Sequence, residues 1–218
     1  MNQRLIDQKQ FLVNFWRKNF SFGNQELDAF MSVNRENFVP DALIGSAYED
    51  VPLPLMRGKT ISQPTTVMMM TAALELKSGD KVFEVGTGSG YQAAIIAKII
   101  GENGKVVSSE IIPELVMYAK RNLIKAGISN VSVFEDDGSK GIESEAPFDK
   151  VILTAACRNF PKPLLEHLKP DGVILGPVGS RHEQEMVKGI KRANGRFEFE
   201  FLGQFVFTPM HGKYGFID

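Results

Sequence analysis

The sequence predicts an α/β fold: a mostly parallel twisted sheet with helices on both faces and an antiparallel hairpin at its C-terminal edge. From residue 64 onward, short apolar segments alternate with helical ones, which is typical of parallel strands joined by helices. Turn signals, Ser-Gly-Asp at 78–80 and Pro-Asp-Gly at 170–172, precede two of the strands. An Asn-Gly pair between strand-like runs in 185–207 predicts the hairpin.

Chain length and hydrophobic patterning divide the 218 residues into parts of one expected domain, 1–218. Residues 1–63 hold N-terminal helices and a long loop, 64–180 the α/β core, and 181–218 the C-terminal strands. Within the core we expect helices at 64–76, 90–100, 113–126 and 161–168, and strands at 81–86, 105–109, 131–135, 149–154 and 172–177.

The first twenty residues predict an amphipathic helix packed on the body, because Leu5, Leu12, Trp16 and Phe20 fall near one helical face. We expect Phe15 to pack inward with Trp16. A helix lying on a membrane surface is the alternative, which the mixed acidic and basic polar face disfavours. Residues 39–64 lack sustained periodicity, and long ordered loops of this kind often carry function.

Composition excludes several classes of protein. The net charge of −1 gives no overall basis for binding nucleic acid or an anionic membrane. One cysteine, Cys157, excludes a disulfide framework; it fits a reducing compartment, and we expect a cytoplasmic protein with this residue packed in the interior. No apolar run reaches the roughly 18 residues of a spanning helix. His-Glu-Gln-Glu at 182–185 lacks the second histidine of a zinc-protease motif, so no metal is expected.

Three glycines, Gly86, Gly88 and Gly90, follow the first core strand, where parallel sheets bind ligands. Their spacing is G-x-G-x-G, which differs from both the dinucleotide fingerprint and the phosphate loop. No lysine or arginine lies in the turn to meet a phosphate. Glu84 lies two residues before the first glycine, and a carboxylate there suits an ammonium group better than a pyrophosphate.

Two further acids follow the next strands of the predicted sheet. Glu110 ends the second strand, where a carboxylate can accept hydrogen bonds from both ribose hydroxyls, and Asp137 follows the third. An amine, a ribose and a base on one ligand describe S-adenosylmethionine better than NAD. Acids are common on protein surfaces, so for Glu110 taken alone an ordinary structural role stays open. The three acids together, on one edge of the sheet, favour cofactor binding.

Four segments resemble the protein-L-isoaspartate (D-aspartate) O-methyltransferase family. They are NRENFVPD at 34–41, YEDVPLPLMRGKTISQP at 48–64, VFEVGTGSGYQAAIIAKI at 82–99 and APFDKVILTAACRNFPKPLLEHLKPDGVILGPVG at 146–179. The resemblance covers most of the chain. It implies the Rossmann-like class I methyltransferase fold and S-adenosyl-L-methionine as cofactor.

Carried over by position, the resemblance implies roles for individual residues. Glu84, Gly86 and Glu110 would hold the methionine and ribose parts of the cofactor, and Asp137 would meet the adenine. Thr60 and Ser62 would lie beside the carboxylate that accepts the methyl group, with Ser62 at the place of the family's proposed active-site serine. The expected cofactor site is completed by Thr87, Gly88, Ser89, Gly90 and Gly138.

The sequence departs from the family's pattern at three places. Asp136 replaces the first glycine of a Gly-Asp-Gly turn, and Cys157-Arg158 replaces Ala-Pro. The C-terminal FTPMHGKYGF, 207–216, follows the usual pattern poorly. These departures concern substrate preference more than cofactor binding.

The implied reaction is methyl esterification of the free carboxylate of L-isoaspartyl residues, with D-aspartyl residues left open, in damaged proteins or peptides. Such a carboxylate is ionised at pH 7 and needs no general base, so alignment and desolvation are the tasks of the site. The expected partners exclude nucleic acid and membrane, and a monomer is the default. The ester is expected to collapse to a succinimide and partly reopen as normal aspartate, which makes this a repair enzyme.

Other interpretations stay open at this point. A methyltransferase of the same fold on tRNA, a nicotinamide oxidoreductase and a non-catalytic cofactor-binding relative are alternatives. A Ser-His-Asp triad has little support, because Ser62 has no nucleophile elbow around it. Ser62 could also serve as the cap of the helix that begins at Pro64. The methionines at 68–70 are expected to fill the core.

Overall fold

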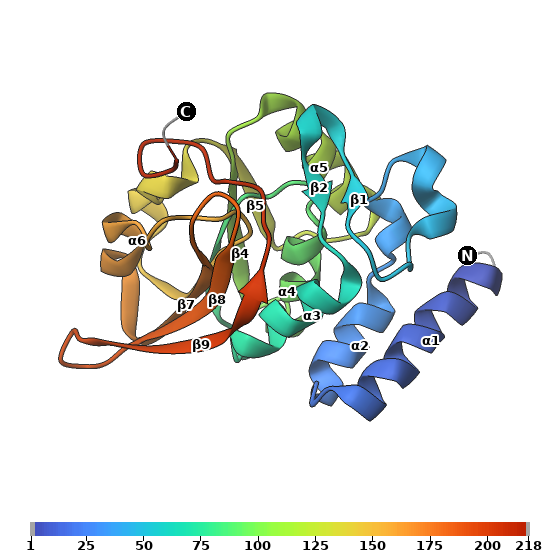
Figure 1. Cartoon of the computed structure of the whole chain (residues 1–218), viewed down its shortest axis with the longest axis horizontal. Coiled ribbons are helices and arrows are strands. Elements are labelled where there is room, and N and C mark those ends of the chain that lie inside the picture. Colours follow the sequence, from blue (N-terminus) through green and yellow to red (C-terminus); the bar gives the residue numbers. More distant parts are fainter. Residues whose placement is uncertain (1–2, 217–218) are drawn as a thin grey trace.

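The computed structural model describes residues 3–216, which are built around a seven-stranded sheet of order β5-β4-β3-β6-β7-β8-β9 (Figure 1). Strands β3 to β7 are parallel, and β8 and β9 are antiparallel, so the predicted mixed sheet is confirmed. The strands are β3 (Lys81–Val85), β4 (Lys105–Glu110), β5 (Val131–Glu135), β6 (Phe148–Leu153), β7 (Leu168–Gly179), β8 (Gln184–Lys191) and β9 (Phe197–Phe205).

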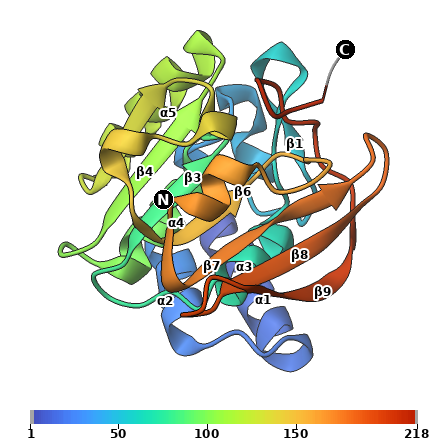
Figure 2. The ribbon, with the colours of Figure 1, turned by 90° about the vertical axis from the view of Figure 1, so that its left-hand side faces the viewer.

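The C-terminal hairpin joins β8 and β9 through the predicted Asn-Gly turn. Gly195 has φ +79, and the Arg192 amide donates to the Arg196 carbonyl at 2.7 Å. Figure 2 shows β7, β8 and β9 side by side, with β9 at the edge of the sheet. β7 is longer than predicted, because it begins at Leu168. The Pro-Asp-Gly turn lies within it, where the register of pairing with β6 shifts and Asp171 has φ +59.

Helices cover both faces of the sheet, as predicted. Leu175 and Ile152 face a core shared with α1 to α5, whereas Phe83 and Leu153 face a smaller core with α6 and the 3-10 turns around 138–145. The helices are α1 (Gln3–Asn19), α2 (Asn24–Ser32), α3 (Pro64–Ala73), α4 (Tyr91–Ile100), α5 (Pro113–Lys125) and α6 (Lys162–Glu166). None of these helices, within residues 3–216, is long and apolar enough to cross a membrane.

The N-terminal helix packs on the body through the predicted face. Leu5, Leu12 and Trp16 are buried, and the Trp16 indole lies edge-on to Phe30 at 4.6 Å between ring centroids. The prediction for Phe15 was wrong: its side chain is 41% exposed, and its ring lies 6.0 Å from that of Phe20 between centroids.

The segment between α2 and α3 contains three short 3-10 helices (Arg35–Asn37, Asp41–Ser46 and Met56–Gly58) and a two-stranded ribbon. Strand β1 (Leu53–Pro54) pairs antiparallel with β2 (Thr60–Ile61). Burial of Leu53 and Ile61 in the larger core ties this ribbon to the body. In Figure 1 the ribbon lies above α3, at the end of the sheet where β4 and β5 finish.

Candidate active site

The glycine turn after β3 is closed by contacts from two neighbouring strands. The Gly86 and Thr87 amides donate to the Ser109 carbonyl at 2.9 and 3.1 Å, and the Thr154 hydroxyl donates to the Gly86 carbonyl at 2.5 Å. A Cβ on Gly86, which has φ +97, would lie 2.5 Å from the Thr154 Oγ1, so only glycine fits there. Gly88, at φ +54, is open instead: a Cβ there would meet nothing within 4 Å, and the residue lines the pocket.

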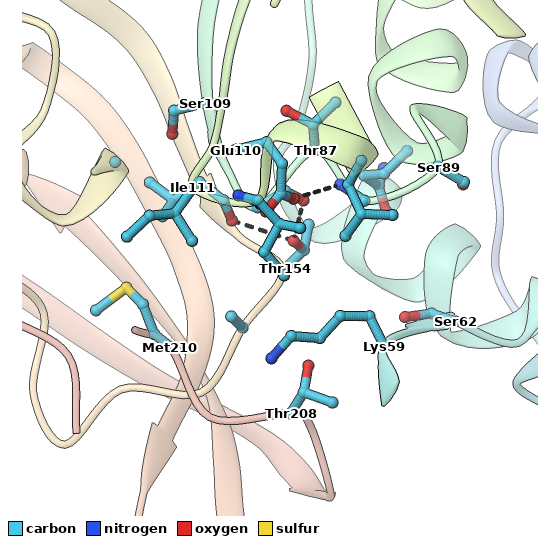
Figure 3. A pocket seen from close by; sticks show the side chains of 18 of the residues that line it. Lys59, Ser62, Thr87, Ser89, Ser109, Glu110, Ile111, Thr154, Thr208 and Met210 are labelled. Carbon is cyan, nitrogen blue, oxygen red and sulfur yellow. Dashed lines mark hydrogen bonds between the residues drawn. The ribbon is translucent and has the colours of Figure 1, made fainter. Parts of the chain in front are cut away.

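Glu110, at the end of β4, is held by the turn that it supports. Its Oε2 accepts the Gly88 amide at 2.9 Å and its Oε1 accepts the Ile112 amide at 3.0 Å (Figure 3). A carboxylate offers about four lone-pair positions. Each oxygen of Glu110 therefore keeps acceptor capacity for a pair of ribose hydroxyls, and the residue lines the pocket as the sequence suggested.

Glu84 lies beneath the glycine turn and does not line the pocket. Its side chain is fully buried; Oε2 accepts a hydrogen bond from the Ser108 hydroxyl, and Oε1 has no partner within residues 3–216. Burial raises the pKa of Glu84 to about 8, with a further contribution from the charge of Glu110, against the Ser108 hydrogen bond. Ser108 also contacts the Thr87 hydroxyl at 2.6 Å, so the carboxyl group supports the turn from below.

Asp137 does not line the pocket either, whereas its neighbours Asp136 and Gly138 do. Its Oδ1 accepts the Ser139 amide and hydroxyl at 3.0 and 2.6 Å, and its Oδ2 accepts the Lys213 amide at 2.8 Å. The carboxylate thus fastens the C-terminal segment 208–216 to the sheet edge. The same segment is paired with Ala156, whose amide donates to the Thr208 carbonyl and whose carbonyl accepts the Met210 amide.

Gly138 and Gly90 have packing roles at this edge. A Cβ on Gly138 would lie 2.0 Å from the Ser109 hydroxyl, so a side chain there would displace Ser109, which lines the pocket. Gly90 begins α4 with φ +87 and packs on Ala119 of α5, outside the pocket lining. Ser89 lines the pocket, and its carbonyl accepts the Asn122 side chain at 3.0 Å.

Thr60 and Ser62 lie on the opposite wall, on and just after β2. Both line the pocket, and neither hydroxyl has a hydrogen-bond partner among residues 3–216. Arg35 fixes the backbone of this wall: its guanidinium is buried and donates to the Ser62 carbonyl at 2.9 Å and to the Ala47 carbonyl at 2.7 Å. The guanidinium also lies 5.2 Å from the Tyr91 ring. Two free hydroxyls on a fixed backbone suit the orientation of an acceptor.

The capping role for Ser62 is not what the structure shows. Gln63 is the residue before α3, and no side chain caps the helix from that position. Asp50, from the preceding loop, accepts the Thr65 amide at 2.9 Å and the Thr65 hydroxyl at 2.6 Å. The first turn of α3 is thus capped by Asp50, which lies 15 residues before Thr65 in the chain. Ser62 therefore remains available to the pocket.

The pocket brings most of the predicted residues together from segments far apart in the chain (Figure 3). Predicted residues on its wall are Thr60, Ser62, Gly86, Thr87, Gly88, Ser89, Glu110 and Gly138. Sequence reasoning missed Lys59, Ser109, Thr154 and the segment Thr208–His211. Thr154 had a usable signal, since it ends a core strand at the edge where Gly86 lies; the C-terminal segment had none.

Cys157, Met68 and Met70 lie in the interior as predicted, whereas Met69 is only half-buried. Cys157 is fully buried next to β7, and burial raises the pKa of its thiol to about 12. Met68 and Met70 are buried in the larger core, and Met70 also contributes to the pocket wall. None of these side chains is placed for nucleophilic chemistry.

The sheet order and the glycine turn define a class I methyltransferase fold. A solved protein-L-isoaspartate O-methyltransferase superposes with a TM-score of 0.85 at 27% identity, over 95% of this chain and 67% of that one. A structure from Plasmodium falciparum, described as a protein-L-isoaspartate O-methyltransferase in complex with S-adenosyl-L-homocysteine, gives 0.80 at 21% identity, over 94% and 98%. At that identity the second likeness concerns the fold alone.

The sequence comparisons identify the family. The profile of the protein-L-isoaspartate(D-aspartate) O-methyltransferase family matches residues 7–215. A protein-L-isoaspartate O-methyltransferase 2 from Archaeoglobus fulgidus is 43% identical over 96% of this chain and 95% of its own length. One from Pyrococcus horikoshii is 47% identical over 86% and 84%. The chain belongs to the protein-L-isoaspartate(D-aspartate) O-methyltransferase family.

Proposed function

We propose that this chain transfers the methyl group of S-adenosyl-L-methionine to the free carboxylate of L-isoaspartyl residues in damaged proteins and peptides. Family membership supports the activity. One structural observation carries the assignment of roles: a single pocket has a glycine turn and Glu110 on one wall, and on the other Thr60 and Ser62, whose hydroxyls have no partner among the described residues.

The pocket residues fit the proposed cofactor. The open backbone at Gly88 and the spare acceptor positions of Glu110 suit a methionine part and a ribose. Glu84 supports the turn from beneath, and its expected contact with the amino group stays a prediction, because the side chain is fully buried and does not line the pocket. When bound, the cofactor supplies a methyl group activated by a sulfonium.

The acceptor wall has the tasks of orientation and desolvation. The acceptor carboxylate has an ordinary pKa near 3 to 4 and attacks as the anion, so no side chain needs to remove a proton. Ser62 and Thr60 are proposed to donate to one carboxylate oxygen and leave the other aligned with the methyl carbon. Fixing the Ser62 backbone through Arg35 keeps that alignment. The β1–β2 ribbon is proposed to hold the peptide backbone in extended form.

The proposal is tested by incubating the protein with labelled S-adenosylmethionine and paired peptides that differ only in aspartyl or isoaspartyl linkage. Label in the isoaspartyl peptide alone is expected. In a parallel incubation with tRNA, label in the tRNA instead would favour the nucleic-acid alternative, and cofactor binding without transfer to any acceptor would favour a non-catalytic relative. We also propose action in the cytoplasm, supported by the single cysteine, without nucleic acid or membrane, supported by the net charge of −1, with a monomer as the default.

The role of Ser62 is tested by replacing it with alanine. Removing one hydrogen bond to a charged group is worth about 1.5–3 kcal/mol, so kcat/KM for the isoaspartyl peptide is expected to fall about tenfold to a hundredfold. Ser78→Ala, an exposed serine before β3, is the matched control and should retain full activity. Unchanged kcat/KM in Ser62→Ala would remove this hydroxyl from the acceptor site.

A further inference from the structure

The loop of the β1–β2 ribbon places a lysine at the acceptor side of the pocket. Lys59 directly precedes Thr60, and its carbonyl accepts the Leu55 amide at 2.7 Å, which closes the loop. The side chain is only partly exposed and lines the pocket. Figure 3 shows it extending from the Ser62 side of the pocket towards Thr208, with its ammonium group inside the cleft.

This ammonium group has no counter-ion in the part of the chain that the structure describes. The neighbouring cation, Arg57, forms an ion pair with Glu114 at the start of α5. Among the described residues, Arg57 therefore has a carboxylate partner and Lys59 has none. The pocket's buried acid, Glu110, already accepts two backbone amides. A half-buried cation without a partner in a cleft favours an anionic ligand.

We propose that Lys59 binds the acceptor carboxylate of the substrate and thereby sets the affinity of this chain for its peptide. The inference rests on the proposed function. Lys59 shares a segment with the two acceptor hydroxyls, whereas the glycine turn and Glu110 lie on the other wall. The carboxylate of the cofactor has the same chemistry and is the competing occupant.

The loss of charge during the reaction determines whether Lys59 acts on KM or on kcat. One carboxylate oxygen forms a bond to the methyl carbon as the bond from that carbon to sulfur breaks, and both the negative and the positive charge disappear. The attraction of Lys59 for the acceptor is therefore stronger in the ground state than in the transition state, and is absent from the neutral ester. Such an interaction lowers KM and does not raise kcat, and it lets the product leave.

The test compares Lys59→Gln with wild type once wild type has been shown to methylate the isoaspartyl peptide. Peptide KM is expected to rise about tenfold, equivalent to an ion pair of roughly 1.4 kcal/mol, with kcat unchanged or slightly higher. Raising the ionic strength should increase the wild-type KM more than that of the variant. Lys59→Arg should retain most of the affinity, because it keeps the cation.

Two controls separate this role from others. Lys125→Gln makes the same charge change at the exposed end of α5 and should leave KM at the wild-type value. Cofactor affinity, measured by calorimetry without peptide, should be the same in Lys59→Gln and wild type. A loss of cofactor affinity that accounts for the whole effect would assign Lys59 to the cofactor carboxylate and overturn the proposal. An unchanged peptide KM, or a fall in kcat alone, would also overturn it.

Discussion

Arg35 allows a direct test of how the N-terminal region holds the acceptor wall. The change is Arg35→Met, which fills a similar volume without donors. Burial lowers the pKa of Arg35 to about 10, so the guanidinium is charged at pH 7 and its charge-assisted bonds are present there. The variant leaves the Ala47 and Ser62 carbonyls without their donor.

The expected loss follows from those contacts. Each carbonyl left without a partner costs about 1–3 kcal/mol, which gives roughly 2–6 kcal/mol for the two. Methionine avoids the desolvation of a buried cation, and the Nη2 of Arg35 has no partner among the described residues, so some of that cost is recovered. We expect the free energy of unfolding to fall by about 2–4 kcal/mol.

Urea denaturation measures the fall in stability, and peptide kinetics measure its consequence for the site. Since the Ser62 carbonyl is one of the two anchors, Arg35→Met should lower kcat/KM for the isoaspartyl peptide while cofactor affinity changes little. Arg35→Lys keeps the charge but reaches fewer acceptors, so its stability and its kcat/KM should lie between those of wild type and Arg35→Met. Arg121→Met, at an exposed position of α5, is the control. A free energy of unfolding within about 0.5 kcal/mol of wild type, together with normal kinetics, would refute the reasoning.

Two further predictions concern neighbouring carboxyl groups. Asp50→Ala removes the acceptor of the Thr65 amide and hydroxyl, and should lower the free energy of unfolding by about 1–3 kcal/mol in a urea titration; Asp50→Asn, which keeps one acceptor, should lose less, and equal losses would contradict the capping role. Glu84 has a pKa raised by burial to about 8 against 4.5 for the free side chain, so the folded state holds its proton where the unfolded state has lost it. Wild-type stability should therefore decline as pH rises from about 4.5 to about 8. Glu84→Gln should show a flatter profile across that window, and identical profiles would show that Glu84 titrates normally.

The sequence predicted the parts of the fold that depend on local pattern. The alternation of apolar strands and helices gave β3, β4 and α4 to within a residue or two, and the Asn-Gly pair gave the hairpin. Glu110 lies on the pocket wall, because the carboxyl ends of neighbouring parallel strands meet at one edge of the sheet, and its role as a cofactor ligand stays a prediction. The single-domain organisation stays a prediction, supported by one hydrophobic core that joins Leu5 to Leu175.

Side-chain direction was harder to predict than position. Glu84 is inside the strand, and with Val82 it points towards the α4 face, so the period of two places it beneath the turn rather than in the pocket. Asp136 and Asp137 are neighbours at a strand end, where the pattern fixes no direction. Which of them faces the pocket depends on Lys213, 76 residues later in the chain than Asp137, because its amide donates a hydrogen bond to the Asp137 carboxylate.

The acceptor wall is held from both sides by long-range contacts that no local pattern encodes. Arg35 fixes the carbonyl of Ser62, and Asp50 fixes Thr65, which also accepts the Trp16 indole N–H at 2.7 Å. The Ser62 hydroxyl belongs to one of these two anchored residues, and the Thr60 hydroxyl lies on β2, which pairs with β1. Lys59 directly precedes Thr60, on the loop of the ribbon. A rigid pair of hydroxyls suits the alignment of a carboxylate for methyl transfer, and a flexible cation suits its capture and release. The loss of kcat/KM expected in Ser62→Ala and the rise in KM with unchanged kcat expected in Lys59→Gln follow from these two roles.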